Sequence, residues 1–441
     1  MKSLWKKYKS DFILINSMVL PMLSAHLMQL LFQIGDQAIV GRLSIHEFAA
    51  VGIVGSFIYF ITGSIGLLGV AFNIIGAKYL GNDDKKSFGD ISNSSITLAV
   101  VLGVICECLI LIGGKWVLVY LYGLDSLTLK YSENYLYISG IGIGIGIGIN
   151  LVLFIFSAYF KNLRKTKIFF ISTIVASIVN ISLDYVLVFG KLGFPQLGTT
   201  GAAIGSVVGL LSSVLICIIA YKKHSFHIFK FRFNRSHLKE LVKLYIPLSL
   251  QDLVESSLFM IFLTMIVSRL HVTSIASYNV ITTLLEFLML PAYAYVGCSM
   301  TLTAQAYSKN RDYFTYVKIA FLSSFLIIIP LSIVIVNYSS YISGFITDKV
   351  EVISQIKDYL MIALLISFIN AAQQIMKYTL QSIDYEKWVM YFSTIIYGIS
   401  IVIIWILSLH AGLWGIYFGL GICYLILMVG FLSKLGRISK L

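Results

Sequence analysis

The stretch FLSSFLIIIPLSIVIV, residues 321–336, contains no charged side chain and is almost wholly apolar. A second block of the same kind is YGISIVIIWIL, residues 397–407. A helix needs about 20 such residues to cross a hydrocarbon core of about 30 Å, whereas a membrane barrel needs short strands of alternating apolar and polar residues. Long apolar blocks therefore predict an all-α integral membrane protein.

The composition of the whole chain supports this prediction. Of the 441 residues, 58% are hydrophobic and 12% are charged, against about 45–50% and about 25% in soluble domains. Twelve apolar blocks are long enough to cross a bilayer, and they leave only short loops and no room for a soluble domain. We predict twelve transmembrane helices, centred near residues 25, 62, 102, 146, 178, 210, 255, 290, 327, 366, 399 and 423.

The distribution of basic residues predicts the orientation of these helices. An even number of spans puts both termini on one side of the membrane. Only seven of the 33 lysines and arginines fall in the loops on the opposite side: Arg42, Lys115, Lys130, Lys191, Arg269, Lys349 and Lys357. The positive-inside rule therefore predicts a multi-pass protein of the cytoplasmic membrane with both termini in the cytoplasm. Topology accounts for the net charge of +13, so the expected partner is the lipid bilayer and not a nucleic acid.

Several short motifs recur in the same order in the two halves of the chain, at offsets between 220 and 228 residues. The matched positions are Pro21 and Pro247, Gly41-Arg42-Leu43 and Ser268-Arg269-Leu270, Asn82 and Asn310, and Ile149-Asn150 and Ile369-Asn370. They predict two pseudo-symmetric six-helix lobes, residues 1–221 and 241–441, joined by a basic cytoplasmic linker at 222–240. Parallel repeats of this kind form a cleft between them and allow alternating access.

Acidic residues inside the apolar blocks indicate where function resides, because an ionised carboxylate costs a few kcal/mol or more at mid-bilayer unless it has water or a partner. Five acids qualify: Asp36, Glu107, Asp184, Glu255 and Glu286. Asn180 lies four residues before Asp184, so the two side chains share one face of a helix. Such a pair has the oxygens to hold Na⁺ and a carboxylate to hold a proton. An interfacial acid that bonds only to water and to nearby polar groups is the alternative.

A set of motifs runs in order along the chain: Pro21, Asp36 with 40–43, Asn180 to Asp184, 188–190, 201–206, Pro247 to Glu255, and Asn370 to Leu380. These motifs resemble those of the multidrug and toxic compound extrusion (MATE) transporters over nearly the whole chain. The resemblance implies two six-helix lobes and a secondary active antiporter, which exports cationic or amphiphilic drugs or metabolites in exchange for Na⁺ or H⁺ and needs no other cofactor. It assigns cation coupling to Asp36, Asn180, Asp184 and Ser206, with the first three as Na⁺ ligands.

The second lobe matches this family less well. Glu255 falls where some members have an acid, but Asn370 stands where those members carry Asp, and an amide cannot take up a proton. We therefore expect coupling in the first lobe and treat Glu255, with Asp252, Asn370 and Gln373, as candidates for the substrate cleft. Asp252 precedes Glu255 by three residues, which predicts that both side chains share one helix face.

Two other classes of protein remain as alternatives. A flippase of a lipid-linked or amphiphilic molecule uses the same two-lobe architecture, but it needs a cationic cleft, and the ionisable residues noted in these spans are mostly acidic. An intramembrane enzyme needs a paired catalytic constellation, which Asp36 and Asp184 imitate without any nucleophile motif. We predict a transporter that acts as a monomer, and no enzymatic activity.

Overall fold

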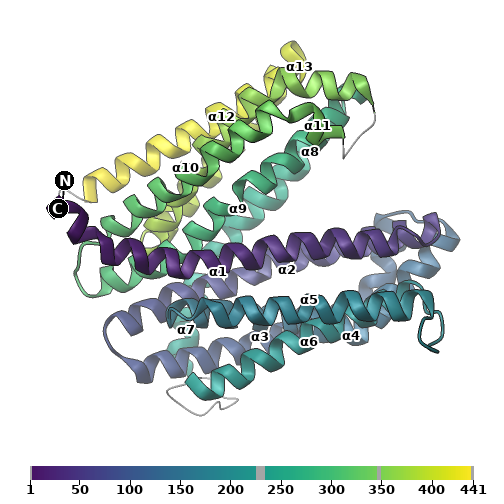
Figure 1. The fold of residues 1–441 in the computed structure, drawn as a ribbon, viewed down its shortest axis with the longest axis horizontal. Coiled ribbons are helices and arrows are strands. Elements are labelled where there is room, and N and C mark those ends of the chain that lie inside the picture. The colour runs from purple at the N-terminus through teal and green to yellow at the C-terminus, as the bar shows by residue number, and fades with distance from the viewer. Residues whose placement is uncertain (1, 225–233, 345–348, 439–441) are drawn as a thin grey trace. The chain divides into compact units, whose positions relative to one another are not determined.

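The computed structural model describes residues 2–224, 234–344 and 349–438, and these residues are almost entirely helical (Figure 1). The α-helices are α1 (Lys2–Val40), α2 (Ile45–Gly81), α3 (Lys85–Trp116), α4 (Ser126–Asn162), α5 (Thr166–Phe189), α6 (Thr199–His224), α7 (Arg235–Asp252), α8 (Phe259–Val267), α9 (Val272–Ser308), α10 (Phe314–Asn337), α11 (Ser339–Gly344), α12 (Val350–Ser382) and α13 (Glu386–Ile438). Two π-helical segments, η1 (Val117–Leu121) and η2 (Leu253–Leu258), continue α3 and α7.

Ten helical segments of the described chain are long and apolar enough to cross a membrane. One of them is α13, which contains two spans because its backbone turns at Gly412. A further helix, α4, has 37 residues and includes the apolar stretch Ile147–Asn162. Each of the twelve predicted spans therefore has a helical counterpart, and the prediction of an all-α membrane protein is confirmed.

The turn inside α13 is set by Gly412, whose φ of 54° lies in the left-handed region that glycine adopts at little cost. The second arm of α13 then runs back along the first. Gly415 lies against the backbone of Leu407, Gly419 lies against Ile404, and the rings of Phe392 and Phe431 have centroids 5.7 Å apart. Antiparallel contacts in this order identify two helices joined by a tight turn.

The chain divides into two compact units, each of which is described by itself. The N-terminal unit is Leu20–Tyr245, and the C-terminal unit joins Met1–Val19 to Ile246–Leu441. The first 19 residues, which the sequence places in the first lobe, group with the second. Their contacts with it include hydrogen bonds from Tyr295 to Asn16 (2.5 Å) and from Tyr316 to Asp11 (3.1 Å). The predicted linker, 222–240, includes the end of α6 and the start of α7, and its residues 225–233 lie outside the described chain.

The turns between helices repeat in the two halves. Positive φ angles occur at Asp83 and Asn310, at Arg164 and Asp384, and at Leu192 and Gly412. These three pairs are separated by 227, 220 and 220 residues, which are the offsets of the repeated sequence motifs. The backbone conformation thus supports two repeats of common architecture independently of the motifs.

Candidate functional site

The N-terminal unit brings Asp36 of α1 and Asp184 of α5 together. Their carboxyl groups lie close enough to interact directly with each other. Asp184 is fully buried and Asp36 is half-buried. In each carboxyl group the Oδ1 atom is shielded from solvent and has no hydrogen-bond partner within the part of the chain that the structure describes. Two acids with free acceptor oxygens are therefore adjacent in a membrane-spanning unit.

Asn180 and Ser206 complete this cluster. The Asn180 amide nitrogen donates to Asp184 Oδ2 at 3.0 Å and lies 3.3 Å from Ser206 Oγ. Asn180 precedes Asp184 by one turn of α5, and Ser206 comes from α6. The structure thus places all four residues that the sequence assigns to cation coupling in a single cluster of two carboxyls, an amide and a hydroxyl.

The approach of α6 to α5 depends on glycine at one-turn intervals. A Cβ at Gly201 would meet the backbone of Leu187 and Val188, and one at Gly209 would meet the carbonyl oxygen of Ala176. At Gly205 a Cβ would overlap the Asp184 carboxylate itself. Small residues at four-residue spacing allow two membrane helices to pack closely, and here they also leave the space that the carboxylate fills.

An apolar cluster lies one helical turn from the acidic cluster, nearer to the loops that follow α1 and α5. It consists of Val40, Val188 and Ala202, with Tyr135 among the residues packed against it. Val40 and Val188 follow Asp36 and Asp184 by four residues, so each helix places an apolar side chain directly beyond its acid. The end of the acidic cluster that faces these loops is therefore lined by apolar side chains.

The chemistry available to this cluster follows from its charge. Two ionised carboxylates in contact repel each other. Their close approach is therefore favourable only when one proton or one cation lies between them. Carboxylate, amide and hydroxyl oxygens are also the ligands that hard cations prefer. The cluster is therefore suited to bind one cation reversibly.

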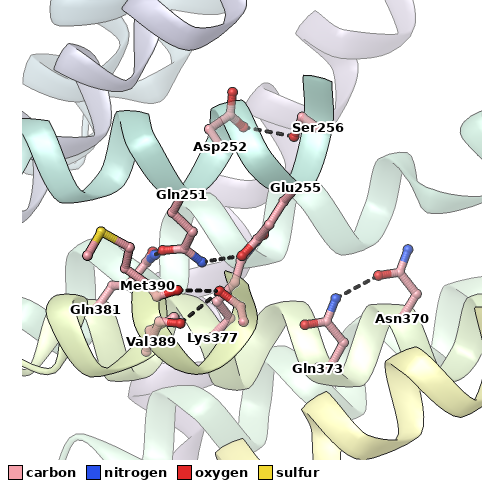
Figure 2. A network of polar contacts seen from close by, with 11 residues as sticks. Gln251, Asp252, Glu255, Ser256, Asn370, Gln373, Lys377, Gln381, Val389 and Met390 are labelled. Carbon is pink, nitrogen blue, oxygen red and sulfur yellow. Dashed lines mark hydrogen bonds and ion pairs between the residues drawn. The ribbon is translucent and has the colours of Figure 1, made fainter. Parts of the chain in front are cut away.

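The C-terminal unit surrounds its buried acid with different groups (Figure 2). Glu255 of η2 is buried and forms an ion pair with Lys377 of α12, at 2.9 Å between Oε2 and Nζ. Its other oxygen, Oε1, accepts a hydrogen bond of 2.6 Å from Gln251 at the end of α7. Gln251 in turn accepts a bond of 2.9 Å from Gln381. Both oxygens of the Glu255 carboxylate are thus occupied.

The other substrate-cleft candidates are distributed differently from the prediction. In Figure 2 the Asp252 carboxylate points away from the Glu255–Lys377 pair and accepts a hydrogen bond from Ser256 at 2.8 Å. The expected common face of Asp252 and Glu255 is absent because the helix becomes π-helical at Leu253, which changes the angle between successive side chains. Gln373 is buried and donates to Asn370 at 2.8 Å.

Sequence reasoning missed two residues. Lys377 carried a clear signal, since it is a basic residue within the predicted span centred near residue 366. Tyr135 of α4 is close enough to Asp36 and Asp184 to interact electrostatically with both. It carried no signal, because one tyrosine among 27 cannot be distinguished by sequence alone.

Comparison with known proteins identifies the family. A sequence profile of the MatE family matches residues 21–186 and 247–406, which is most of the chain. The chain belongs to the MatE family. The resemblance drawn from its motifs is confirmed, and so is the prediction of a multi-pass membrane transporter and not an enzyme.

Individual relatives agree with this assignment. The probable multidrug resistance protein NorM of Bacillus cereus is 28% identical over 221 residues, which cover 47% of this chain and 48% of that protein. NorM of Bacillus licheniformis is 26% identical over 356 residues, which cover 76% of this chain and 75% of that protein. The first of these matches thus spans about half the length of the relative.

The fold agrees as well. A crystal structure of a mutant Vibrio cholerae MATE transporter superposes with a TM-score of 0.88 at 16% identity, covering 99% of this chain and 98% of that one. The MatE fold of the chain is therefore shown, while the roles of individual site residues rest on their geometry.

Proposed function

We propose that this MatE protein is a secondary active antiporter that exports cationic or amphiphilic drugs or metabolites in exchange for Na⁺ or H⁺. The observation that carries the proposal is the Asp36–Asp184 contact, buried beside Asn180 and Ser206 in a membrane-spanning unit. Two acids placed together, one of them fully buried, have little structural value, because each raises the cost of ionising the other. They are useful when a cation binds and leaves in every cycle.

Cation binding at this cluster is coupled to conformation by its effect on charge. With the cluster empty and ionised, the N-terminal unit favours a state in which water reaches the carboxylates. A bound proton or Na⁺ neutralises much of that charge and removes the penalty of closing the unit around the acids. A ligand that prefers one of two states shifts the population towards that state, which is what alternating access requires.

Both termini lie in the cytoplasm, in line with the bias of basic residues across the loops. The transporter acts as a monomer, since one chain contains both units. Asp252 and Asn370 are partly exposed and are proposed to contact substrate, and the names of the NorM relatives suggest multidrug substrates.

The test is transport by the purified protein in liposomes. A fluorescent cationic dye is loaded, and a pH gradient and a Na⁺ gradient are imposed in turn. Dye movement against its own gradient, driven by at least one of the two, is the expected result. Movement of a fluorescent lipid analogue without any dye transport would instead support a flippase.

A further inference from the structure

The Glu255–Lys377 pair is a buried ion pair that the proposed cation cycle does not use. Its side chains are 6% and 9% exposed, and one Glu255 oxygen receives the ammonium while the other receives the Gln251 amide. Both residues lie within helices that span the membrane. The pair brings one negative and one positive charge into contact, so the charge of Glu255 is balanced without any bound ion.

We propose that Lys377 is a tethered cation that takes the place of an exchangeable one at Glu255, and thereby excludes the C-terminal unit from ion coupling. This inference deepens the proposed function and rests on it, because it assigns all coupling to the Asp36–Asp184 cluster. Lys377 is then the residue that determines how many cations move in each cycle.

Competition at Glu255 explains why a free cation does not bind there. A tethered ammonium has a high effective concentration at its partner, so it displaces ions from solution. A Na⁺ that entered, or a proton that neutralised Glu255, would leave the Lys377 ammonium buried and unpaired, which is unfavourable. Asp184 differs on this point, since its Oδ1 is buried without a hydrogen-bond partner in the described chain.

Removal of Lys377 should therefore create a new cation site. In Lys377→Met the lysine side chain is replaced by an uncharged side chain of similar shape. The hydrogen bond from Gln251 to Glu255 remains. The carboxylate then has no counter-ion, so it takes up either a proton or Na⁺ from solution. Lys377→Arg keeps the charge and should leave Glu255 closed to other cations.

The experiment measures bound cations directly in the full-length protein. The background carries Asp36→Asn and Asp184→Asn, which silence the N-terminal cluster. Infrared spectra report protonated carboxyl groups over a pH series, and ²²Na⁺ binding is measured at each pH. Adding Lys377→Met should produce one additional cation site per protein, seen as a new carboxyl signal or as bound ²²Na⁺. Adding Lys377→Arg, or Lys377→Met together with Glu255→Gln, should produce none.

Two outcomes would overturn the inference. One is a folded Lys377→Met protein that gains neither a carboxyl signal nor ²²Na⁺. The second outcome does not depend on whether Lys377→Met folds. It comes from a comparison of the wild-type protein with the Glu255→Gln/Lys377→Met double variant, which should bind the same number of cations. A double variant that binds one fewer would show that Glu255 is already an exchangeable site.

Failure of the proposed function would appear in the transport measurement and not in the cation count. Gradient-driven dye transport that survives in Asp184→Asn would refute coupling at the N-terminal cluster, whatever Lys377 does. The cation count at Glu255 is read in protein that need not transport, so the two hypotheses are tested by separate measurements.

Discussion

The two units place similar groups around their buried acids and reach opposite chemical results. In each, an amide four residues before the acid donates a hydrogen bond to it: Asn180 to Asp184 at 3.0 Å and Gln251 to Glu255 at 2.6 Å. The next neighbour then differs, since Asp184 contacts a second acid, Asp36, whereas Glu255 contacts an ammonium. Under our proposal, the sign of this one neighbouring charge decides whether a buried carboxylate is open to cations.

The most severe test of this contrast removes the negative charge from each unit. Asp184→Asn and Asp36→Asn should each reduce gradient-driven dye efflux to the level of empty liposomes, because an amide neither takes a proton nor attracts a cation strongly. The substitution preserves side-chain volume, so expression and detergent stability should change little. Glu255→Gln/Lys377→Met, which removes the charges of the other unit as a pair, should retain gradient dependence. The opposite pattern would reverse the roles of the two units.

A second test measures what the ion pair contributes to stability. Removing one partner of a buried pair costs about 3–5 kcal/mol, whereas replacing both is often close to neutral. Glu255→Gln alone should therefore destabilise the protein strongly, and Glu255→Gln/Lys377→Met should restore most of the loss. Unfolding in a denaturing-detergent titration can be followed by the reaction of a thiol dye with the buried Cys217, Cys298 and Cys423.

The chain offers a matched control for that measurement. Lys115 and Glu133 form an ion pair of similar length, 3.0 Å, but their side chains are 60% and 21% exposed, against 9% and 6% for Lys377 and Glu255. Breaking this pair with Lys115→Met should cost no more than about 1 kcal/mol, because solvent screens exposed charges. Equal losses from Lys115→Met and Glu255→Gln would show that burial does not strengthen the Glu255–Lys377 pair.

Much of the fold was predictable because a membrane span needs only length and hydrophobicity. The predicted spans centred near residues 399 and 423 were found as the two arms of α13, because Gly412 reverses the chain between them. The grouping of residues 1–19 with the C-terminal unit was not predictable. It reflects tertiary contacts between residues far apart in the chain, such as the hydrogen bond from Tyr295 to Asn16, and sequence spacing does not predict such contacts.

The candidate sites also contain some features that the sequence predicts and others that depend on the tertiary structure. Asn180 and Asp184 are one turn apart on a regular helix, so their contact follows from the spacing, and the family resemblance supplied Asp36 and Ser206. In the C-terminal unit, the spacing rule failed at Asp252 and Glu255 because η2 is π-helical. The pairing of Glu255 with Lys377 joins residues 122 positions apart, and only the tertiary structure brings them together.

A third test alters the space around Asp184 without altering its charge. Gly205→Ala places a methyl group where the carboxylate lies, and overpacking of this kind costs about 1–3 kcal/mol. Displacement of Asp184 should also weaken efflux, though less than Asp184→Asn does. Gly55→Ala is the control, since a Cβ at Gly55 meets no atom within 4 Å and should be neutral or slightly stabilising. Full activity and stability in Gly205→Ala would contradict the observed contact.

The smallest expected effect concerns the two amides and separates Na⁺ from H⁺. Asn180 donates to Asp184 Oδ2, a geometry that suits a carboxyl group alone, whereas Na⁺ requires the amide to turn and present its oxygen. Asn180→Ala should therefore raise the half-saturating Na⁺ concentration by about tenfold, the equivalent of one neutral polar contact. Proton-driven efflux, which needs only a carboxylate, should change much less.

Gln251→Ala is the matched substitution in the C-terminal unit, because Gln251 makes the same kind of bond to Glu255. Lys377 already neutralises that acid, so loss of the amide should leave the half-saturating Na⁺ concentration and the pH dependence of efflux unchanged. Both quantities are measured in the same liposomes for the two alanine variants. A Na⁺ response to Gln251→Ala as large as that to Asn180→Ala would mean that both units bind the coupling ion, because only an amide beside an exchangeable cation can alter the affinity for that cation.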